Sequence, residues 1–235
     1  MVSVCIATYN GEKYIKDQLL SILCQIDNYD EIIVSDDSST DETLNIIRSI
    51  NDNRIRILDN NKYQSPIYNF ENAIKHANGD YIFLSDQDDV WLPDRIKLMK
   101  TYLDNYCLVI SDCKIVDSLL NVTNESFFKL CNSGKGFWKN LIKNSYIGCC
   151  MAFKKDLLKY VLPFPKNLPM HDIWIGLLAE LNGDVLFIDT PLLLYRRHGT
   201  NASSSGEESK YSLYYKVEYR LLLLLDILKR QYFRI

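Results

Sequence analysis

The sequence predicts an α/β fold in which helices flank both faces of a mostly parallel central sheet. Between Val2 and Ser111, short apolar runs alternate with segments whose apolar residues recur at helical spacing. The runs are apolar throughout, which is typical of parallel strands that are covered on both sides. At 235 residues, 47% of them hydrophobic, the chain is long enough for one large domain.

The first half of the chain follows a regular strand–helix order. Its apolar runs predict strands at 2–7, 31–35, 54–58, 80–84 and 108–111. Helical spacing predicts helices at 14–26, 44–50, 66–77 and 93–103, two of which begin at a proline. The second half is less regular, and we expect helices at 137–143, 173–181 and 211–235 and strands at 147–153, 184–188 and 192–195. Residues 199–209, rich in Gly, Ser, Asn and Glu, are expected to form a flexible loop.

Composition argues against several functions. A net charge of −3 provides no broad basic field for nucleic acid. Seven cysteines without a CxxC pair argue against a zinc site and suit a reducing compartment. The N-terminal segment does not have the pattern of a signal peptide, and the sequence contains no run of about 18 apolar residues. We therefore expect a cytoplasmic protein without a transmembrane helix.

Acidic and polar residues gather where three of the predicted strands end. Thr8 follows the first strand, Asp36 and Asp37 end the second, and a D-x-D of Asp86 and Asp88 follows the fourth. Ligands of such sheets bind beyond the carboxyl ends of the strands. These residues should therefore converge on one crevice.

Two interpretations of the acidic segment at 86–89 are open. Asp88 and Asp89 precede Pro93, and carboxylates are favoured at helix starts, so one interpretation is a helix cap. The other is a site for Mg²⁺ or Mn²⁺ with a bound diphosphate, because these cations take carboxylate and phosphate oxygens. Asp89 is the residue most readily explained as a cap alone.

Three further clusters each allow a structural and a functional interpretation. Asp37 either belongs to a capping turn or accepts hydrogen bonds from a nucleobase or ribose. Asp172 either caps the helix that follows it or acts as a general base delivered by a Pro-framed loop. His198, next to Arg196 and Arg197, is either structural or a ligand of metal or phosphate.

Five segments, taken in order, resemble the successive motifs of the family 2 inverting glycosyltransferases, which have the GT-A fold. They are SVCIATYNGEKYI, DEIIVSDDSSTDET, GDYIFLSDQDDVWLPDRI, MHDIW and LLLYRRHG. The resemblance is greatest to a bacterial branch with rhamnosyltransferase-like members that build surface polysaccharides. It implies a Rossmann-like sheet with a smaller mixed region on the acceptor side. Residues 1–112 would form the nucleotide-sugar-binding half and 113–200 the acceptor-binding and catalytic half of one domain, followed by a flexible loop and C-terminal helix at 201–235.

The resemblance also implies roles for individual residues. It assigns nucleotide contacts to Ala7, Thr8, Tyr9, Asp37 and Asp86. Asp88 would be the direct ligand of Mn²⁺ or Mg²⁺, and His198 would close over the metal or the diphosphate. His171, Arg196 and Arg197 would contact the diphosphate or the acceptor.

The implied activity is transfer of rhamnose or a hexose from a UDP- or dTDP-sugar to a hydroxyl of a glycan or lipid-linked glycan. Asp172 would be the catalytic base of a metal-assisted, inverting single displacement. Because His171 stands where many members have Glu, a nucleotide-sugar-binding protein with impaired catalysis is one alternative.

A nucleotidyltransferase is a second alternative, although TYNGEKY is not the glycine-rich phosphate loop that such an enzyme would carry. The sequence has no G-x-G-x-x-G of a dinucleotide oxidoreductase. A phospho-acceptor receiver domain would leave the second half of the chain unexplained.

The predicted C-terminal helix contains five consecutive leucines, Leu221–Leu225, between basic residues at both ends. Three interpretations follow from this pattern. The helix packs on the core, forms a homodimer contact, or attaches the protein peripherally to the inner face of the cell membrane.

Overall fold

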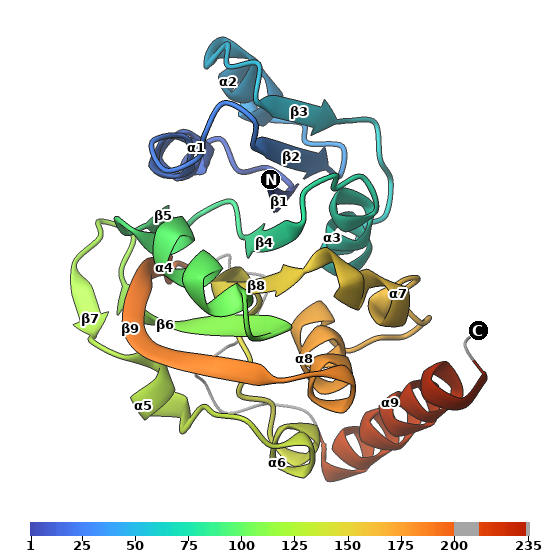
Figure 1. Ribbon diagram of the computed structural model, residues 1–235. Helices are drawn as coiled ribbons and strands as arrows, with labels where there is room; N and C mark the ends of the chain where they lie inside the picture. The colour runs from blue at the N-terminus through green and yellow to red at the C-terminus, as the bar shows by residue number, and fades with distance from the viewer. Residues whose placement is uncertain (200–211, 234–235) are drawn as a thin grey trace.

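The computed structural model describes residues 1–199 and 212–233, and in this part of the chain helices surround one mixed sheet (Figure 1). The strands are β1 (Val2–Thr8), β2 (Glu31–Asp36), β3 (Ile55–Leu58), β4 (Tyr81–Ser85), β5 (Val90–Trp91), β6 (Leu108–Val116), β7 (Val122–Asn124), β8 (Met151–Lys154) and β9 (Val185–Arg196). The helices are α1 (Ile15–Leu23), α2 (Thr43–Ser49), α3 (Pro66–Lys75), α4 (Arg95–Leu103), α5 (Phe127–Cys131), α6 (Phe137–Ile142), α7 (Leu158–Val161), α8 (His171–Asn182) and α9 (Leu213–Phe233).

The sheet has the strand order β3-β2-β1-β4-β8-β6-β9-β5, with β7 paired to β6. The four strands of the first half, β3, β2, β1 and β4, are parallel neighbours. β8 lies between β4 and β6 and is antiparallel to both. β6 and its parallel partner β9 therefore run in the same direction as β4. The predicted α/β class with a mostly parallel sheet is confirmed.

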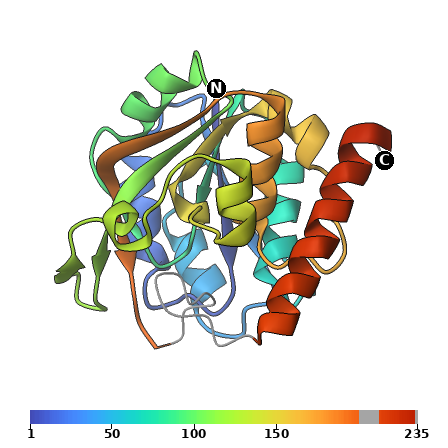
Figure 2. The same ribbon diagram turned by 90° about the horizontal axis from the view of Figure 1, so that it is seen from below.

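Helices cover both faces of the sheet, as the apolar strands predict. Figures 1 and 2 show α3 and α8 on one side, with α9 outside them, and α1 and α4 on the other. Between these layers lie fully buried side chains, of which the largest apolar ones are Trp174, Phe70, Phe83 and Phe153. Burying each of them stabilises the fold by roughly 1.5–3 kcal/mol.

The second half of the chain departs from the prediction in several places. The expected strand at 147–153 begins only at Met151, because Gly148–Cys150 form a 3₁₀ turn. The strands expected at 184–188 and 192–195 are one strand, β9, which stays paired with β6 across two register shifts. The short elements β5, β7, α5 and α7 were not predicted, because two to five residues carry too little periodicity to identify an element.

α9 has two apolar faces. Leu223 and Ile227 are buried against the body of the protein, and Arg230 donates hydrogen bonds to the carbonyl oxygens of Leu162 and Pro163. The predicted packing on the core is therefore present. On the other face Leu221, Leu222, Leu225 and Leu228 are exposed, and contact of this face with a membrane or a second copy stays a prediction.

The predicted flexible loop lies outside the described residues, apart from Gly199. Within residues 1–199 and 212–233, no helix combines the length and the apolar character that crossing a bilayer requires.

Candidate active site

A large cavity opens at the carboxyl ends of β1, β2 and β4. Its volume is about 1340 Å³, more than the roughly 300–1,000 Å³ of ordinary small-molecule sites. Its wall contains the residues that follow the three strands, together with the start of α3, the 3₁₀ turn at 148–150 and the start of α8. Of the predicted site residues, those that line it are Ala7, Thr8, Tyr9, Asp37, Asp86, Asp88, His171, Asp172 and His198.

The two carboxylates at the end of β2 have different environments. Asp36 is fully buried and accepts hydrogen bonds from the Thr8 hydroxyl (2.9 Å) and the Ser39 backbone N–H (2.8 Å), so it supports the turn. Asp37 lines the cavity and accepts the backbone N–H groups of Tyr63 (2.6 Å) and Ser65 (3.1 Å), one on each oxygen. A carboxylate has about four lone-pair sites, so Asp37 retains acceptor capacity toward a ligand.

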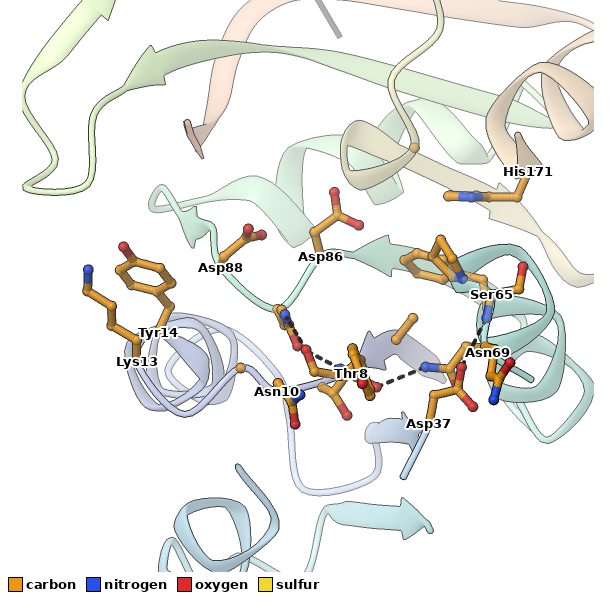
Figure 3. Close-up of a pocket in the computed structure, with 18 of the residues that line it drawn as sticks. Thr8, Asn10, Lys13, Tyr14, Asp37, Ser65, Asn69, Asp86, Asp88 and His171 are labelled. Carbon is orange, nitrogen blue, oxygen red and sulfur yellow. Dashed lines mark hydrogen bonds between the residues drawn. The ribbon is translucent and has the colours of Figure 1, made fainter. Parts of the chain in front are cut away.

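Asn69 is a cavity residue that was not predicted. Its side-chain N–H₂ donates to the carbonyl oxygen of Thr8 (3.1 Å), which also accepts the backbone N–H of Asp37 (2.9 Å). The sequence offers one signal for it, a polar residue beside Phe70 on the buried side of α3. Figure 3 shows Thr8, Asp37 and Asn69 together at one end of the cavity.

Gln87, between the two acids of the D-x-D, is another residue without a predicted role. Its Oε1 accepts the backbone N–H of Tyr9 (2.9 Å), and its Nε2 donates to the Tyr9 carbonyl oxygen (3.1 Å). Gly11 leaves room for this amide, since a Cβ at that position would lie 2.4 Å from Oε1. The pair joins the loop after β1 to the loop after β4.

Asp86 and Asp88 face the cavity, whereas Asp89 turns away from it. Asp89 is fully buried, and its Oδ1 accepts the backbone N–H of Arg196 (3.0 Å). It does not cap α4, whose N-cap is Asp94, so the interpretation of Asp89 as a helix cap is wrong. Through this bond Asp89 instead connects the acidic segment to the end of β9.

Burial and mutual repulsion change the protonation of these acids. Burial first, and the Asp88 charge second, raise the pKa of Asp86 to about 7. The same two causes raise the pKa of Asp89 well above its ordinary value. A bound cation would relieve this repulsion, which favours the cation-site interpretation of the segment.

Asp88 contacts His198 directly. The Oδ2 of Asp88 lies 2.7 Å from Nε2 of His198, and the imidazole stacks on Tyr14 with ring centroids 5.0 Å apart. Both residues line the cavity, and Figure 3 shows Asp88 and Tyr14 at its opposite end from Asp37. An oxygen and a nitrogen donor side by side fit Mn²⁺, whereas Mg²⁺ prefers oxygen ligands alone.

A second group of metal-ligating atoms lies deeper in the protein. Atoms of Asp86, Asp89 and Cys149 fall within 4.8 Å of one another. Of these residues only Asp86 lines the cavity, so this group is less accessible to a nucleotide diphosphate than the Asp88–His198 pair.

The structure does not place Arg196 and Arg197 in the described cavity wall. Arg196 is buried, donates from Nε to the carbonyl oxygen of Asp88 (2.7 Å) and lies over the Tyr14 ring at 4.3 Å. It therefore holds the backbone that presents Asp88. The guanidinium of Arg197 lies 6.0 Å from the ring of Tyr195.

Asp172 lies in the first turn of α8, which begins one residue earlier and has Met170 as its N-cap. The interpretation of Asp172 as the cap is therefore wrong. Both hydrogen bonds that the structure gives its carboxylate fall on Oδ1, from the Ile173 backbone N–H (2.6 Å) and the Asn144 side chain (3.2 Å). Burial raises the pKa of Asp172 to about 7, the range in which a carboxylate works as a general base near neutral pH.

His171 precedes Asp172 and also faces the cavity. Burial lowers the pKa of its imidazole to about 3, so the ring is neutral. A neutral ring supplies no charge to a diphosphate but can still donate one hydrogen bond, so the contact of His171 with the diphosphate or the acceptor stays a prediction.

Comparison with known proteins identifies the family. Residues 3–162 match Glycosyl transferase family 2. The chain is 33% identical over 223 residues to dTDP-rhamnosyl transferase RfbG of Shigella flexneri, covering 83% of this chain and 72% of that protein. It is 25% identical over 185 residues to an Escherichia coli protein, UDP-Glc:alpha-D-GlcNAc-diphosphoundecaprenol beta-1,3-glucosyltransferase WfgD, covering 77% and 71%.

Solved structures share the fold. The S. aureus TarS 1-349 complex with UDP-GlcNAc superimposes with a TM-score of 0.73 at 23% identity, covering 97% of this chain and 66% of that chain. Glucosyl-3-phosphoglycerate synthase from Mycobacterium tuberculosis, in complex with Mn²⁺, UDP and phosphoglyceric acid, gives a TM-score of 0.58 at 17% identity, covering 98% and 78%. These likenesses confirm the predicted GT-A fold. Because the family match spans more than half of the chain, the protein belongs to glycosyl transferase family 2 and is a glycosyltransferase.

Proposed function

We propose that this protein transfers rhamnose or a hexose from a UDP- or dTDP-sugar to a hydroxyl of a glycan, by a single inverting displacement. The observation that carries the proposal is the placement of Asp172, with its pKa raised to about 7, in the same cavity as the Asp88–His198 pair. One group suits proton removal from an acceptor, and the other suits the charge of a leaving diphosphate.

Asp172 acts as the base. Its Oδ1 is held by Ile173 and Asn144, which orients the carboxylate and leaves Oδ2 to take the proton of the acceptor hydroxyl. The acceptor oxygen then forms a bond to the anomeric carbon as the bond from that carbon to the diphosphate oxygen breaks. Attack from the face opposite the leaving group inverts the anomeric configuration.

Asp88 and His198 hold the divalent cation in this proposal. The donor set of one carboxylate and one imidazole favours Mn²⁺ over Mg²⁺. A cation bound there supplies positive charge to the departing nucleoside diphosphate. Arg196 positions Asp88 through its backbone, and Tyr14 supports the His198 ring.

The nucleotide occupies the end of the cavity formed by Ala7, Thr8, Tyr9 and Asp37, with Asp86 toward the ribose. Asp37 is fixed by two backbone N–H groups, so its remaining lone pairs have defined directions toward a base N–H. Among the relatives, a dTDP-rhamnosyl transferase and a glucosyltransferase that uses UDP-Glc support a dTDP or UDP donor, and the diphosphoundecaprenol substrate of the latter supports a lipid-linked acceptor. We infer that the acceptor is a glycan of bacterial surface polysaccharide, free or linked to a lipid carrier. A cytoplasmic location, at the inner face of the membrane where such a carrier is used, stays a prediction.

The test is a transfer and hydrolysis assay with UDP-glucose and dTDP-rhamnose in the presence of Mn²⁺. Asp88→Ala should abolish metal-dependent turnover, and Asp172→Asn should abolish transfer while leaving nucleotide-sugar binding intact. Asp17→Asn, an exposed aspartate on α1, is the matched control and should be fully active. NMR of the product should show inversion at the anomeric carbon.

Two outcomes would contradict the proposal. Turnover that Asp88→Ala leaves unchanged would exclude the cation role. Binding of nucleotide sugars without any turnover would favour the alternative, a binding protein with impaired catalysis.

A further inference from the structure

Helix α6 carries two exposed apolar side chains among lysines. Trp138 is 64% exposed and Ile142 is 66% exposed, and their four-residue spacing places them on one side of the helix. Lys135, Lys139 and Lys143 are exposed as well, and none of the three forms an ion pair with another described residue. An exposed apolar patch rimmed by charged residues marks an interaction site.

The charge of this part of the chain is one-sided. No Asp or Glu occurs between Glu125 and Asp156, although the whole chain has a net charge of −3. Glu180 reaches this segment from α8, but its carboxylate accepts the Gly136 backbone N–H (2.8 Å) and the Tyr146 hydroxyl (2.6 Å). The lysines of α6 therefore present a local excess of positive charge to the solvent.

Helix α9 extends the apolar part of this surface. Arg220 donates to the carbonyl oxygen of Leu141 (3.0 Å), so α6 and α9 lie side by side, as Figures 1 and 2 also show. Exposed apolar residues recur along α9 at helical spacing and form one stripe, which consists of Val217, Leu221, Leu225 and Leu228. Over its described length α9 has four basic and two acidic side chains, and it therefore keeps the positive excess. We call this stripe, together with Trp138, Ile142 and the three lysines of α6, the α6–α9 surface.

The chemistry of this surface selects an anionic bilayer over a second copy of the chain. Tryptophan is enriched at the level of the lipid head groups, an apolar helix face enters the boundary with the acyl chains, and lysines attract anionic head groups. In a two-fold dimer the same patch faces itself, which would bring the lysines of the two α6 helices together. We propose that the α6–α9 surface binds the protein peripherally to a bilayer that contains anionic phospholipids.

The surface is continuous with the cavity wall that carries the proposed base. Lys143 is followed by Asn144, whose side chain donates to Oδ1 of Asp172 (3.2 Å). A bilayer bound to this surface would lie on the side of the molecule where α8 presents Asp172. An acceptor on a lipid carrier would then reach the base from the membrane. The bilayer contact itself goes beyond the proposed function and does not depend on it.

Flotation of the full chain with vesicles of phosphatidylcholine, with and without phosphatidylglycerol, tests the proposal. We expect binding to the anionic vesicles only, and at least fivefold weaker binding when the ionic strength rises from about 0.1 M to about 1 M. Lys139→Gln combined with Lys143→Gln should weaken binding at least about tenfold, because each lysine near an anionic surface contributes roughly fivefold. Lys16→Gln combined with Lys97→Gln, which alters exposed lysines of α1 and α4 on the other side of the sheet, is the matched control and should stay within about twofold.

Tryptophan fluorescence identifies the surface that meets the lipid. Trp91 is 3% exposed and Trp174 is 0% exposed, so Trp138 is the tryptophan whose environment a bound bilayer would change. Anionic vesicles should shift the emission to shorter wavelength and protect it from quenching by acrylamide. Trp138→Phe should remove this shift and keep vesicle binding within about threefold, because phenylalanine retains an apolar ring.

Several outcomes would overturn the inference. They are equal binding to neutral and anionic vesicles, an equal loss in the two lysine pairs, and vesicle binding that leaves the emission unchanged. A dimer in sedimentation velocity that Leu221→Ser dissociates, without vesicle binding, would identify a second copy as the occupant. Titration of each variant with UDP and Mn²⁺ separates lost lipid binding from misfolding, since the Kd should stay unchanged. Failure of the unsubstituted protein to bind UDP would contradict the proposed function and leave the bilayer contact as it is.

Discussion

The side-chain amide of Gln87 pairs with the backbone of Tyr9 through two hydrogen bonds, of 2.9 and 3.1 Å. This contact connects the loop that carries Asp86 and Asp88 to the loop that lines the proposed nucleotide end of the cavity. It adds a side-chain link between the two loops to the backbone pairing of β1 with β4.

Because Gln87 holds the Tyr9 loop in place, removing its side-chain amide should weaken nucleotide binding. Gln87→Ala leaves the Tyr9 N–H and carbonyl without this partner, at a cost of about 1–2 kcal/mol. We expect the Kd for UDP with Mn²⁺ to rise roughly 5- to 30-fold in calorimetry. Gln231→Ala, which alters a glutamine of α9 outside the cavity wall, is the control and should stay within about twofold. Equal changes in the two variants would show that Gln87 has no special positioning role.

The catalytic rate should depend on pH through Asp172. Its carboxyl has a pKa of about 7 and must be ionised to accept a proton, so kcat should fall about tenfold for each pH unit well below 7 and level off above about 8. A pH–rate profile that is flat from pH 5 to 8 would exclude Asp172 as the base.

The same pKa predicts how Asp172 affects stability. The folded-state pKa is raised above the unfolded value of about 3.9, so above pH 7 the native state must hold a buried charge that the unfolded chain holds in water. Asp172→Asn should therefore raise the thermal midpoint at pH 8 and change it little at pH 4. A midpoint at pH 8 that is lower than that of the unsubstituted protein would contradict the assignment.

Metal preference should depend on His198. An imidazole nitrogen beside the Asp88 carboxylate suits Mn²⁺ better than Mg²⁺. His198→Ala should weaken activation by Mn²⁺ at least about tenfold and affect Mg²⁺ less, so that the preference for Mn²⁺ narrows. Activity against metal concentration measures this, with His76→Ala as the control for loss of a histidine. A parallel loss with both metals would mean that His198 acts on the diphosphate and not on the cation.

Substitutions on the two faces of α9 should differ in their effect on the free energy of unfolding. Leu223 is 2% exposed and Leu222 is 48% exposed, although they are neighbours. Leu223→Ala should lower the free energy of unfolding by about 2–5 kcal/mol, and Leu222→Ala by less than about 0.5 kcal/mol. Urea denaturation of the two variants measures both values. Similar values for the two would show that α9 does not pack on the body as described.

The sequence predicts the first half of the fold well, because buried parallel strands and amphipathic helices have different periodicities. The acids at the ends of β2 and β4 also meet in one cavity, as the topology requires. Local sequence patterns mispredict the role of a residue whose side chain contacts a segment distant in the sequence. Asp89 was interpreted as a cap because Pro93 follows it, yet its partner is the backbone of Arg196 on β9.

Other residues of the site give no local signal at all. The bond between Gln87 and Tyr9 depends on β1 and β4 being neighbours and on the missing Cβ of Gly11. The packing of the His171 ring becomes evident only when Phe70 and Gly148 are seen to lie against it. These features come from packing between segments that the sequence alone does not place in contact.

The insertion of β8 between β4 and β6 also determines how the chain can fold as it is synthesised. Ala152 of β8 is registered with Phe83 on one side and Val109 on the other, so the centre of the sheet is completed by a late segment. A nascent chain that ends near residue 112 would have the inner edge of β4 unpaired, and such an edge is prone to intermolecular pairing. Folding should therefore be slow, with contacts distant in sequence, and cooperative across both halves. Residues 1–112 are thus not expected to fold as a separate module, because their part of the sheet is completed by β8 from the second half of the chain.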